Sequence, residues 1–282
     1  MRILVTNDDG VHAPGLAVLA AALARAGHAV TVVAPLAEAS GAGAGVGPLH
    51  VMGGGIHVEA VTPPGLDGIT TLGADALPAL IVITACLGAY GPPPDLIVAG
   101  INPGRNVGRA VLHSGTVGAA LTSVHFGFRG LAVSIQAGPV AAFESAGEDK
   151  IHFETAAAIA VVLAEHLEHA PARTVVNCNV PNLAMSDVRG IRRARLATSG
   201  LIRAAAGGAT RATDDPSVKL EMGFRDSADD DDSDEALSTR GWAVVTPLAS
   251  VTEDLRTEVG EVVAASIAEV AARYEINVGD QA

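Results

Sequence analysis

Apolar and polar positions alternate in blocks along the first two thirds of the chain. Short runs rich in β-branched residues, bounded by Gly, Pro or Asn, predict strands at residues 3–6, 28–34, 95–99, 131–135 and 174–179. Longer stretches between them have the length and composition of helices and occupy residues 15–26, 74–88, 117–124 and 153–169. This alternation predicts an α/β fold with parallel strands and right-handed crossovers.

The pattern weakens beyond residue 181. Four arginines between 189 and 195 are followed by the acidic run DSADDDDSDE, a short strand at 241–247 and a final helix. In that helix one face collects apolar side chains, namely Leu255, Val259, Val262, Val263 and Val270. We expect a core over residues 1–185 and a C-terminal extension over 186–282, with a hairpin or loop appendage, a returning strand and a terminal helix. The aspartates at 229–232 lack the spacing and glycine of a calcium loop, so a solvated, mobile loop is expected there.

Composition narrows the class of protein. With 282 residues, 49% of them hydrophobic, the chain is large enough to bury a substantial core. Its 31 acidic and 18 basic residues give a net charge of −13, which argues against binding duplex nucleic acid, because that affinity needs clustered Lys and Arg. Cys86 and Cys178 lie in separate apolar stretches without a CxxC pair, so we expect buried, reduced thiols and a cytoplasmic location.

Neither a membrane span nor a signal peptide is expected. The uncharged stretch 76–91 is short for a spanning helix and contains Pro78 and Gly88. At the N-terminus, Asp8 and Asp9 interrupt the first apolar run.

Polar side chains follow three of the predicted strands. Asp8 and Asp9 follow the first, Ser40 the second, and Asn102 the strand at 95–99. In a parallel sheet, ligands bind beyond the carboxyl ends of the strands. Carboxylate, hydroxyl and amide oxygens suit Mg²⁺, Mn²⁺ or Ca²⁺, and a cation would offset the repulsion between adjacent carboxylates. The alternative is a turn in which Asp8 and Asp9 cap the following helix.

The segment HSGTVG at 113–118 has the composition of a helix N-terminus whose N–H groups can hold a phosphate, or of a plain helix cap. Three familiar nucleotide or phosphate folds fit poorly. A haloacid-dehalogenase phosphatase needs DxD, but Gly10 stands two positions after Asp8, and a receiver domain needs an Asp at the end of its third strand, whereas Asp95 begins one. The dinucleotide fingerprint GxGxxG does not follow the first strand.

Several segments taken together resemble the survival protein SurE family of metal-dependent nucleotidases: ILVTNDDGVHAPG, the PxxxxSG of 35–41, DLIVAGINPGRNVG, HSGTVGAALTSVHFG, NCNVP and DEALSTRGWAVVTPL. The resemblance covers the first 135 residues almost continuously and returns at 177–181 and near the last strand. It implies a Rossmann-like three-layer α/β sandwich with a mostly parallel sheet and a C-terminal oligomerisation appendage.

The resemblance also implies a site. One divalent metal ion per subunit, Mg²⁺ or Mn²⁺, with Ca²⁺ as a substitute in crystals, would be held by Asp8, Asp9, Ser40 and Asn102. Catalysis would rest on Asp8, Asp9 and Asn102, and the substrate phosphate would contact Asn106, Ser114, Gly115 and Thr116. Homodimers or homotetramers would form partly through exchanged C-terminal elements.

Three segments depart from the family pattern. Between Pro35 and Ser40 the family usually has DRNR, whereas this chain has LAEA, and its GTPADC segment is TLGADA here, at 71–76. Arg109 and Ala110 replace an acidic pair, and His113 replaces a tyrosine. The metal-binding positions are retained while the surrounding loops differ, so the metal site is better specified than the substrate.

We therefore expect a divalent-metal-dependent phosphomonoesterase, a 5'/3'-nucleotidase that converts nucleoside monophosphates to nucleoside and phosphate. The metal would polarise the phosphoryl oxygens and supply or orient an attacking water while backbone N–H groups stabilise the developing charge. An aspartyl nucleophile is the alternative. The rival from another class is a diverged protein with a different phosphate-ester substrate or a non-catalytic, metal- or ligand-binding role.

Overall fold

The described part of the 282-residue chain comprises residues 1–48, 55–136, 151–198, 202–203, 221–222, 231–251 and 257–274 of a computed structural model. Internal contacts divide the chain into two units, Met1–Leu248 and Ala249–Ala282. The second unit contains α7 (Thr257–Tyr274), the expected terminal helix. Leu255 and the side chains of Val263 and Val270 lie outside the described residues, as do Asp229 and Asp230 of the acidic run.

Within the described residues, nine strands form one sheet in the order β3-β4-β2-β1-β5-β6-β7-β11-β8. Its six inner strands are parallel: β4 (Thr70–Ala74), β2 (Ala29–Pro35), β1 (Arg2–Thr6), β5 (Leu96–Pro103), β6 (Arg129–Gln136) and β7 (Val175–Pro181). At the edges, β3 (Val58–Ala60) runs antiparallel to β4, β11 (Ala243–Leu248) runs antiparallel to β7, and β8 (Ile191–Arg193) runs parallel to β11. The mostly parallel sheet expected from the sequence is confirmed.

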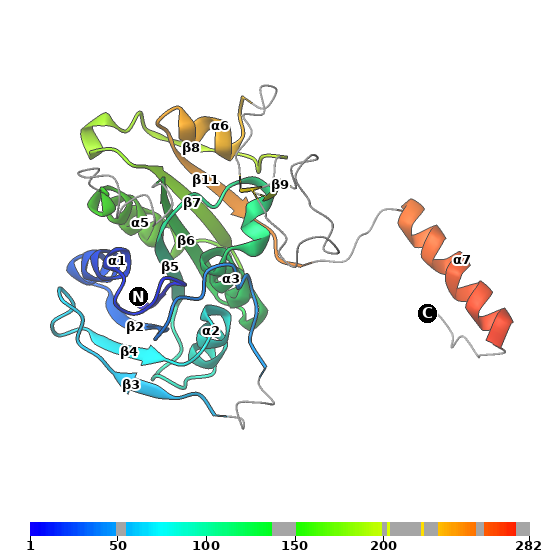
Figure 1. Cartoon of the computed structure of the whole chain (residues 1–282), viewed down its shortest axis with the longest axis horizontal. Helices are drawn as coiled ribbons and strands as arrows, with labels where there is room; N and C mark the ends of the chain where they lie inside the picture. The colour runs from blue at the N-terminus through cyan, green and yellow to red at the C-terminus, as the bar shows by residue number, and fades with distance from the viewer. Residues whose placement is uncertain are drawn as a thin grey trace, which may run out of the picture. The chain divides into compact units, whose positions relative to one another are not determined.

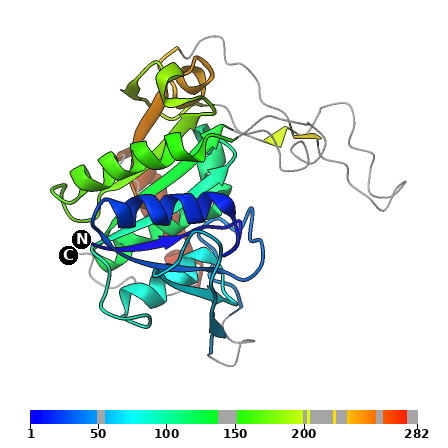
Figure 2. The same ribbon diagram turned by 90° about the vertical axis from the view of Figure 1, so that its left-hand side faces the viewer.

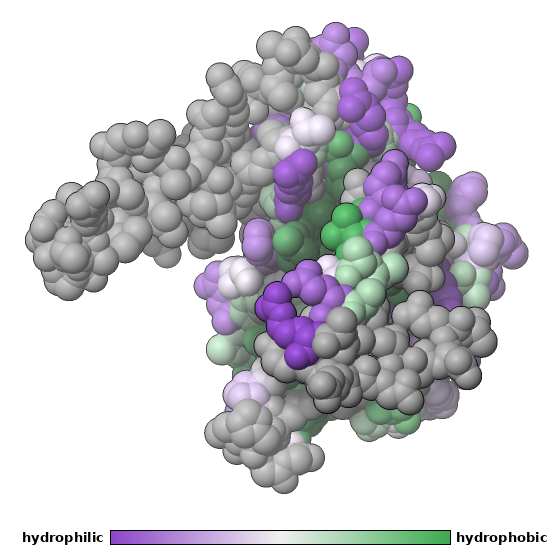
Figure 3. Space-filling view, turned by 90° about the vertical axis from the view of Figure 1, so that its right-hand side faces the viewer, coloured by the Kyte–Doolittle hydropathy of each residue, from purple (hydrophilic) through white to green (hydrophobic). Residues whose placement is uncertain are grey.

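Helices cover both faces of the sheet (Figures 1 and 2). α1 (Pro14–Arg25) and α5 (Phe153–Leu167) pack on one face, and α2 (Pro78–Cys86) and α3 (Gly115–Thr122) pack on the other. The central strands are apolar on both sides because both faces are covered, and Val5, Val98 and Val133 are fully buried. One face of the molecule shows apolar side chains recessed between hydrophilic ones (Figure 3).

The start of α1 lies unusually close to β5. A Cβ on Gly15 would lie 2.4 Å from the backbone oxygen of Ile101, so only glycine permits this approach. Pro14 begins the helix, where its missing N–H costs no hydrogen bond. The chain therefore turns tightly from the loop after β1 into α1, against the end of β5.

The helix expected over 74–88 is wrong in its first four residues. Thr70–Ala74 forms β4, which pairs with β2, and α2 begins only at Pro78. Proline favours the first turn of a helix, and the β-branched Thr70 and Thr71 favour the strand before it. The strands β3 and β8 and the helix α6 (Asp234–Thr239) were also not predicted.

The described residues also form shorter elements: η1 (Gly108–His113), η2 (Ser123–Phe126), η3 (Met185–Asp187) and the antiparallel pair β9 (Ile202–Arg203) and β10 (Glu221–Met222). Since β8 and β11 extend the sheet, the boundary expected at residue 185 falls inside the first unit.

Both cysteines are buried and free, and burial raises the pKa of the Cys86 thiol to about 11. Among the helices of the described residues, none has the length and apolar character needed to cross a membrane.

The strand order places a topological switch beside β1. The chain leaves β1 for β2 and β4 on one side and returns to β5 on the other side of β1. At such a point the loops leaving the carboxyl ends of the two neighbouring strands diverge and open a crevice. The loops that follow β1, β2 and β5 therefore meet at one edge of the sheet.

Candidate metal and phosphate site

The loop after β1 carries the two adjacent aspartates into this crevice. Neighbouring segments hold it: Ala39 N donates to the Asp8 backbone oxygen at 2.7 Å, and Val11 N donates to the backbone oxygen of Pro35 at 2.8 Å. Gly10, with φ of 101°, supplies a left-handed turn directly after Asp9. The loops after β1 and β2, predicted to meet, are therefore joined by backbone hydrogen bonds.

Asp8 is buried against the N-terminus of α3. The Thr116 hydroxyl donates to Asp8 Oδ1, and a Cβ on Gly115 would lie 2.7 Å from the Asp8 Cβ, so glycine permits the contact. Burial raises the pKa of Asp8, while hydrogen bonds from the Thr116 side chain and from the backbone around Gly115 act in the opposite direction. Gly115 and Thr116, expected beside a phosphate, thus contact the carboxylate of Asp8.

Asp9 is the less satisfied of the two carboxylates. Its Oδ2 is buried and has no hydrogen-bond partner among the described residues. Burial, then the charges of Asp8 and Glu38, raise the pKa of Asp9 to about 7. An unpartnered buried carboxylate oxygen beside a second carboxylate is unfavourable in a metal-free protein and favourable next to a cation. The residues present therefore fit a divalent metal ion.

The other two expected ligands lie on the flanking loops. Ser40 is exposed, and its hydroxyl donates to Glu38 Oε1 at 2.9 Å. Asn102 lies near the end of β5, where its Nδ2 donates to the Gly104 backbone oxygen at 2.7 Å, so Oδ1 is the amide atom suited to a cation. Across the described ranges, no three His, Cys, Asp or Glu side chains gather in one place, and the candidate donor set is two carboxylates, a hydroxyl and an amide.

Asn106 is held by an asparagine network. Its N–H donates to Asn179 Oδ1 at 2.8 Å, and its backbone oxygen accepts from Asn177 Nδ2 and Asn179 Nδ2 at 2.8 and 3.0 Å. Its Nδ2 donates to the Ser134 hydroxyl at 2.9 Å. That hydroxyl can also donate, so a half-turn of the amide would keep this contact and free Nδ2 to donate elsewhere. NCNVP was noticed in the sequence, but this role of its two asparagines was not predicted.

Ser114 caps α3. Its hydroxyl accepts from Val117 N at 3.1 Å, as in the plain-cap alternative. Gly43 N donates to the His113 backbone oxygen at 3.2 Å, and a Cβ on Gly118 would lie 2.2 Å from the Gly43 oxygen. The loop after β2 is therefore packed on the first turns of α3, which brings the segment after Ser40 beside the helix that holds Asp8.

Sequence reasoning also missed Asp234, a fully buried residue at the start of α6. Its carboxylate accepts from three backbone N–H groups in separate segments: Gly108 at 3.0 and 3.2 Å, Ala197 at 2.9 Å and Glu235 at 2.9 Å. Burial raises its pKa, and these donors oppose the rise. Its only sequence cue is an aspartate beside the N-cap Ser233, which also occurs at ordinary helix starts.

The pKa of Asp9 predicts how the stability of the metal-free protein depends on pH. Because the folded-state value is about 7 and the ordinary value is 3.8, the folded protein binds this proton more tightly than the unfolded chain. The contribution is complete below the ordinary value and is lost as the pH rises through about 7, up to about 4 kcal/mol. Urea unfolding in EDTA should therefore show the free energy of unfolding falling over this range, and less so in Asp9→Asn. Excess Mn²⁺ should make the free energy of unfolding depend less steeply on pH. If the free energy of unfolding of Asp9→Asn falls with pH as steeply as that of the wild type, the pH dependence does not come from Asp9.

Comparisons with known proteins agree with this arrangement. The family described as Survival protein SurE matches residues 3–203. The 5'-nucleotidase SurE of Xanthomonas campestris pv. campestris is 39% identical over 198 residues, 70% of this chain and 70% of that protein. The 5'/3'-nucleotidase SurE of Shigella dysenteriae serotype 1 is 38% identical over 206 residues, again 70% of each chain.

A solved structure extends the similarity to the whole fold. The crystal structure of the SurE protein from Aquifex aeolicus aligns with a TM-score of 0.66 at 25% identity and covers 96% of this chain and 99% of that one. The family match includes the loop after β1, where Asp8 and Asp9 lie, the loops after β2 and β5, and the start of α3. This chain belongs to the survival protein SurE family.

Proposed function

We propose that this chain is a divalent-metal-dependent phosphomonoesterase that hydrolyses nucleoside monophosphates, a 5'/3'-nucleotidase. The observation that carries the proposal is the carboxylate pair, in which Asp8 is fixed by Thr116 and the buried Oδ2 of Asp9 lacks a partner in the described part of the chain. The substrate class is supported by relatives named 5'-nucleotidase and 5'/3'-nucleotidase.

In this proposal Asp8, Asp9, Ser40 and Asn102 hold one Mg²⁺ or Mn²⁺ per subunit. Both are hard cations that prefer oxygen donors. A bound ion would polarise the phosphoryl group and offset its negative charge. Asp9 then has the largest effect among the four, because its charge is the least compensated by the chain's own donors.

The chain's own residues would orient the phosphate. Asn106 is fixed by hydrogen bonds to its N–H, its carbonyl and its side chain, and a group held so firmly loses little entropy on binding substrate. The first turn of α3, at Ser114, Gly115 and Thr116, would present the positive end of a helix dipole to the phosphate, with the backbone N–H groups at Gly115 and Thr116 shared with the Asp8 carboxylate. We further propose that the protein works in the cytoplasm as a homodimer or homotetramer, with C-terminal elements exchanged between subunits.

The test is phosphate release from a panel of nucleoside 5'- and 3'-monophosphates with Mn²⁺ or Mg²⁺, and with EDTA as the control. Turnover that requires the metal and falls away in EDTA is expected. No release from any phosphomonoester under any metal would refute the proposal and favour the non-catalytic, ligand-binding rival.

A further inference from the structure

A cavity of about 350 Å³ lies against the loop after β2. Its walls come from three segments: residues 35–39, residues 46–48, and residues 74–80 at the end of β4 and the start of α2. Small-molecule sites in proteins begin at about 300 Å³, so this volume suits a single nucleoside-sized group.

The cavity adjoins the candidate metal site. Glu38 lines it, and the same carboxylate accepts from the Ser40 hydroxyl at 2.9 Å. Ala39, also in the wall, donates its N–H to the Asp8 backbone oxygen at 2.7 Å. A phosphate ester bound at the aspartates would therefore have this cavity next to it.

The lining combines apolar walls with two carboxylates. Pro35, Leu77 and Leu80 supply apolar surface, Glu38 and Asp75 supply the charges, and none of the described lining residues is Lys, Arg or His. Such a lining accepts hydrogen bonds from hydroxyl and amino groups and repels anions. A leaving group that carries a second phosphate would be repelled by the carboxylates of Glu38 and Asp75, in addition to those of Asp8 and Asp9.

Two segments supply most of the cavity wall. Residues 36–39 (LAEA) supply Ala37, Glu38 and Ala39, and residues 71–76 (TLGADA) supply Ala74, Asp75 and Ala76. Leu36 N donates to the Ala74 backbone oxygen at 2.9 Å, which joins the two segments. Small alanine side chains therefore leave the cavity open, and each segment places one carboxylate in its wall.

We propose that this cavity binds the uncharged nucleoside part of the substrate, and that Glu38 and Asp75 select against leaving groups that carry a second phosphate. This inference rests on the proposed function and adds the site that discriminates between esters. Both carboxylates are exposed at the rim, so solvent screens their repulsion and the selectivity is moderate.

The selectivity test compares kcat/KM for adenosine 5'-monophosphate, adenosine 3',5'-bisphosphate and p-nitrophenyl phosphate, each with Mn²⁺. The wild type should prefer the monophosphate over the bisphosphate, and Asp75→Asn should reduce that preference about three- to tenfold. Asp67→Asn, the same change at an exposed position outside the cavity, should leave the preference unchanged. Equal use of both nucleotides by the wild type, or an unchanged ratio in Asp75→Asn, would overturn the charge selection.

A second variant tests occupancy. Ala76→Phe places a ring in the cavity and should lower the ratio of kcat/KM for adenosine 5'-monophosphate to that for p-nitrophenyl phosphate by about tenfold. Adenosine binding, measured by calorimetry without metal or turnover, should be weakened by the same factor. If no ester is hydrolysed, the proposed function fails while adenosine binding still tests the cavity. If esters are hydrolysed but adenosine does not bind, the proposed function stands and the proposal that this cavity binds the nucleoside is wrong.

Discussion

Asp9→Asn is expected to reduce metal-stimulated kcat/KM by about 10²-fold or more while the protein stays folded. The substitution keeps the shape of the side chain and removes the charge that a cation would need. Asp9 Oδ2 has no partner in the described part of the chain, so no existing hydrogen bond to it is lost. The measurement is phosphate release over a range of Mn²⁺ concentrations, together with circular dichroism and Mn²⁺ binding followed by electron paramagnetic resonance.

Asp8→Asn should also reduce metal-stimulated activity, though less than Asp9→Asn, and should have a different effect on stability. Asp8 accepts from the Thr116 hydroxyl and from backbone N–H groups at Gly115 and Thr116, so an amide nitrogen in place of one carboxylate oxygen would face a backbone donor. Asp8→Asn should therefore lower the free energy of unfolding in EDTA, and Asp9→Asn should leave it unchanged or raise it above about pH 7.

The exposed Asp67→Asn is the control for charge alone and should leave activity and Mn²⁺ binding intact. Normal turnover in Asp9→Asn would mean that the metal lies elsewhere. Loss of turnover with undiminished Mn²⁺ binding would assign Asp9 a role in the reaction other than holding the ion.

The fold was predictable where residue pattern and tertiary environment agree. The runs at 3–6, 28–34 and 95–99 are apolar because β1, β2 and β5 are buried, and their polar ends mark where each strand leaves the sheet. β4 was not predictable from TTLGA alone, since a short segment with a glycine becomes a strand only by pairing with β2. α6 is short and follows an acidic run, so its helical pattern is weak.

In the candidate site, too, some features were predictable from the residue pattern and others depend on contacts between distant segments. Asp8, Asp9, Ser40 and Asn102 could be proposed as a site because each follows a predicted strand, and the strand order places the loops after those strands at one edge of the sheet. Contacts between distant segments carry no comparable pattern. Thr116 reaches Asp8 across 108 positions, and Asn179 reaches Asn106 across 73. Only the packing of α3 and β7 on the central strands makes them neighbours.

Asp234→Ala is expected to cost about 3–5 kcal/mol of stability and to lower activity further than unfolding explains. The carboxylate is fully buried, and its removal leaves the N–H groups of Gly108 and Ala197 without their acceptor. For a domain of this size, such a loss corresponds to a fall in Tm of roughly 10 °C. Thermal unfolding and urea titration measure it directly.

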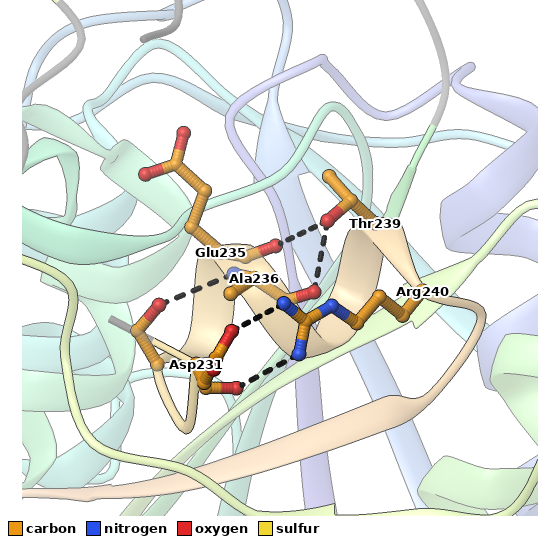
Figure 4. A network of polar contacts seen from close by, with 6 residues as sticks. Asp231, Glu235, Ala236, Thr239 and Arg240 are labelled. Atoms are coloured by element: carbon orange, nitrogen blue, oxygen red, sulfur yellow. Dashed lines mark hydrogen bonds and ion pairs between the residues drawn. The ribbon is translucent and has the colours of Figure 1, made fainter. Parts of the chain in front are cut away.

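Asp231 provides the matched control, three residues earlier in the same segment. It forms an ion pair with Arg240 beside α6, where Thr239 donates to the backbone oxygens of Glu235 and Ala236 (Figure 4). Its side chain is 78% exposed, so Asp231→Ala should change stability by about 1 kcal/mol or less. Equal effects of the two substitutions would show that the hydrogen bonds of Asp234 contribute little.

The activity of Asp234→Ala separates positioning from simple destabilisation. Gly108 lies two residues after Asn106, so freeing its N–H loosens the chain that holds this asparagine against β7. At a temperature where the variant is fully folded, kcat should therefore fall about tenfold while Mn²⁺ affinity, set by the loops after β1, β2 and β5, stays unchanged. Asp234→Asn keeps one acceptor oxygen and should recover part of both stability and kcat. If kcat is normal in folded Asp234→Ala, the link between α6 and the Asn106 loop is structural only.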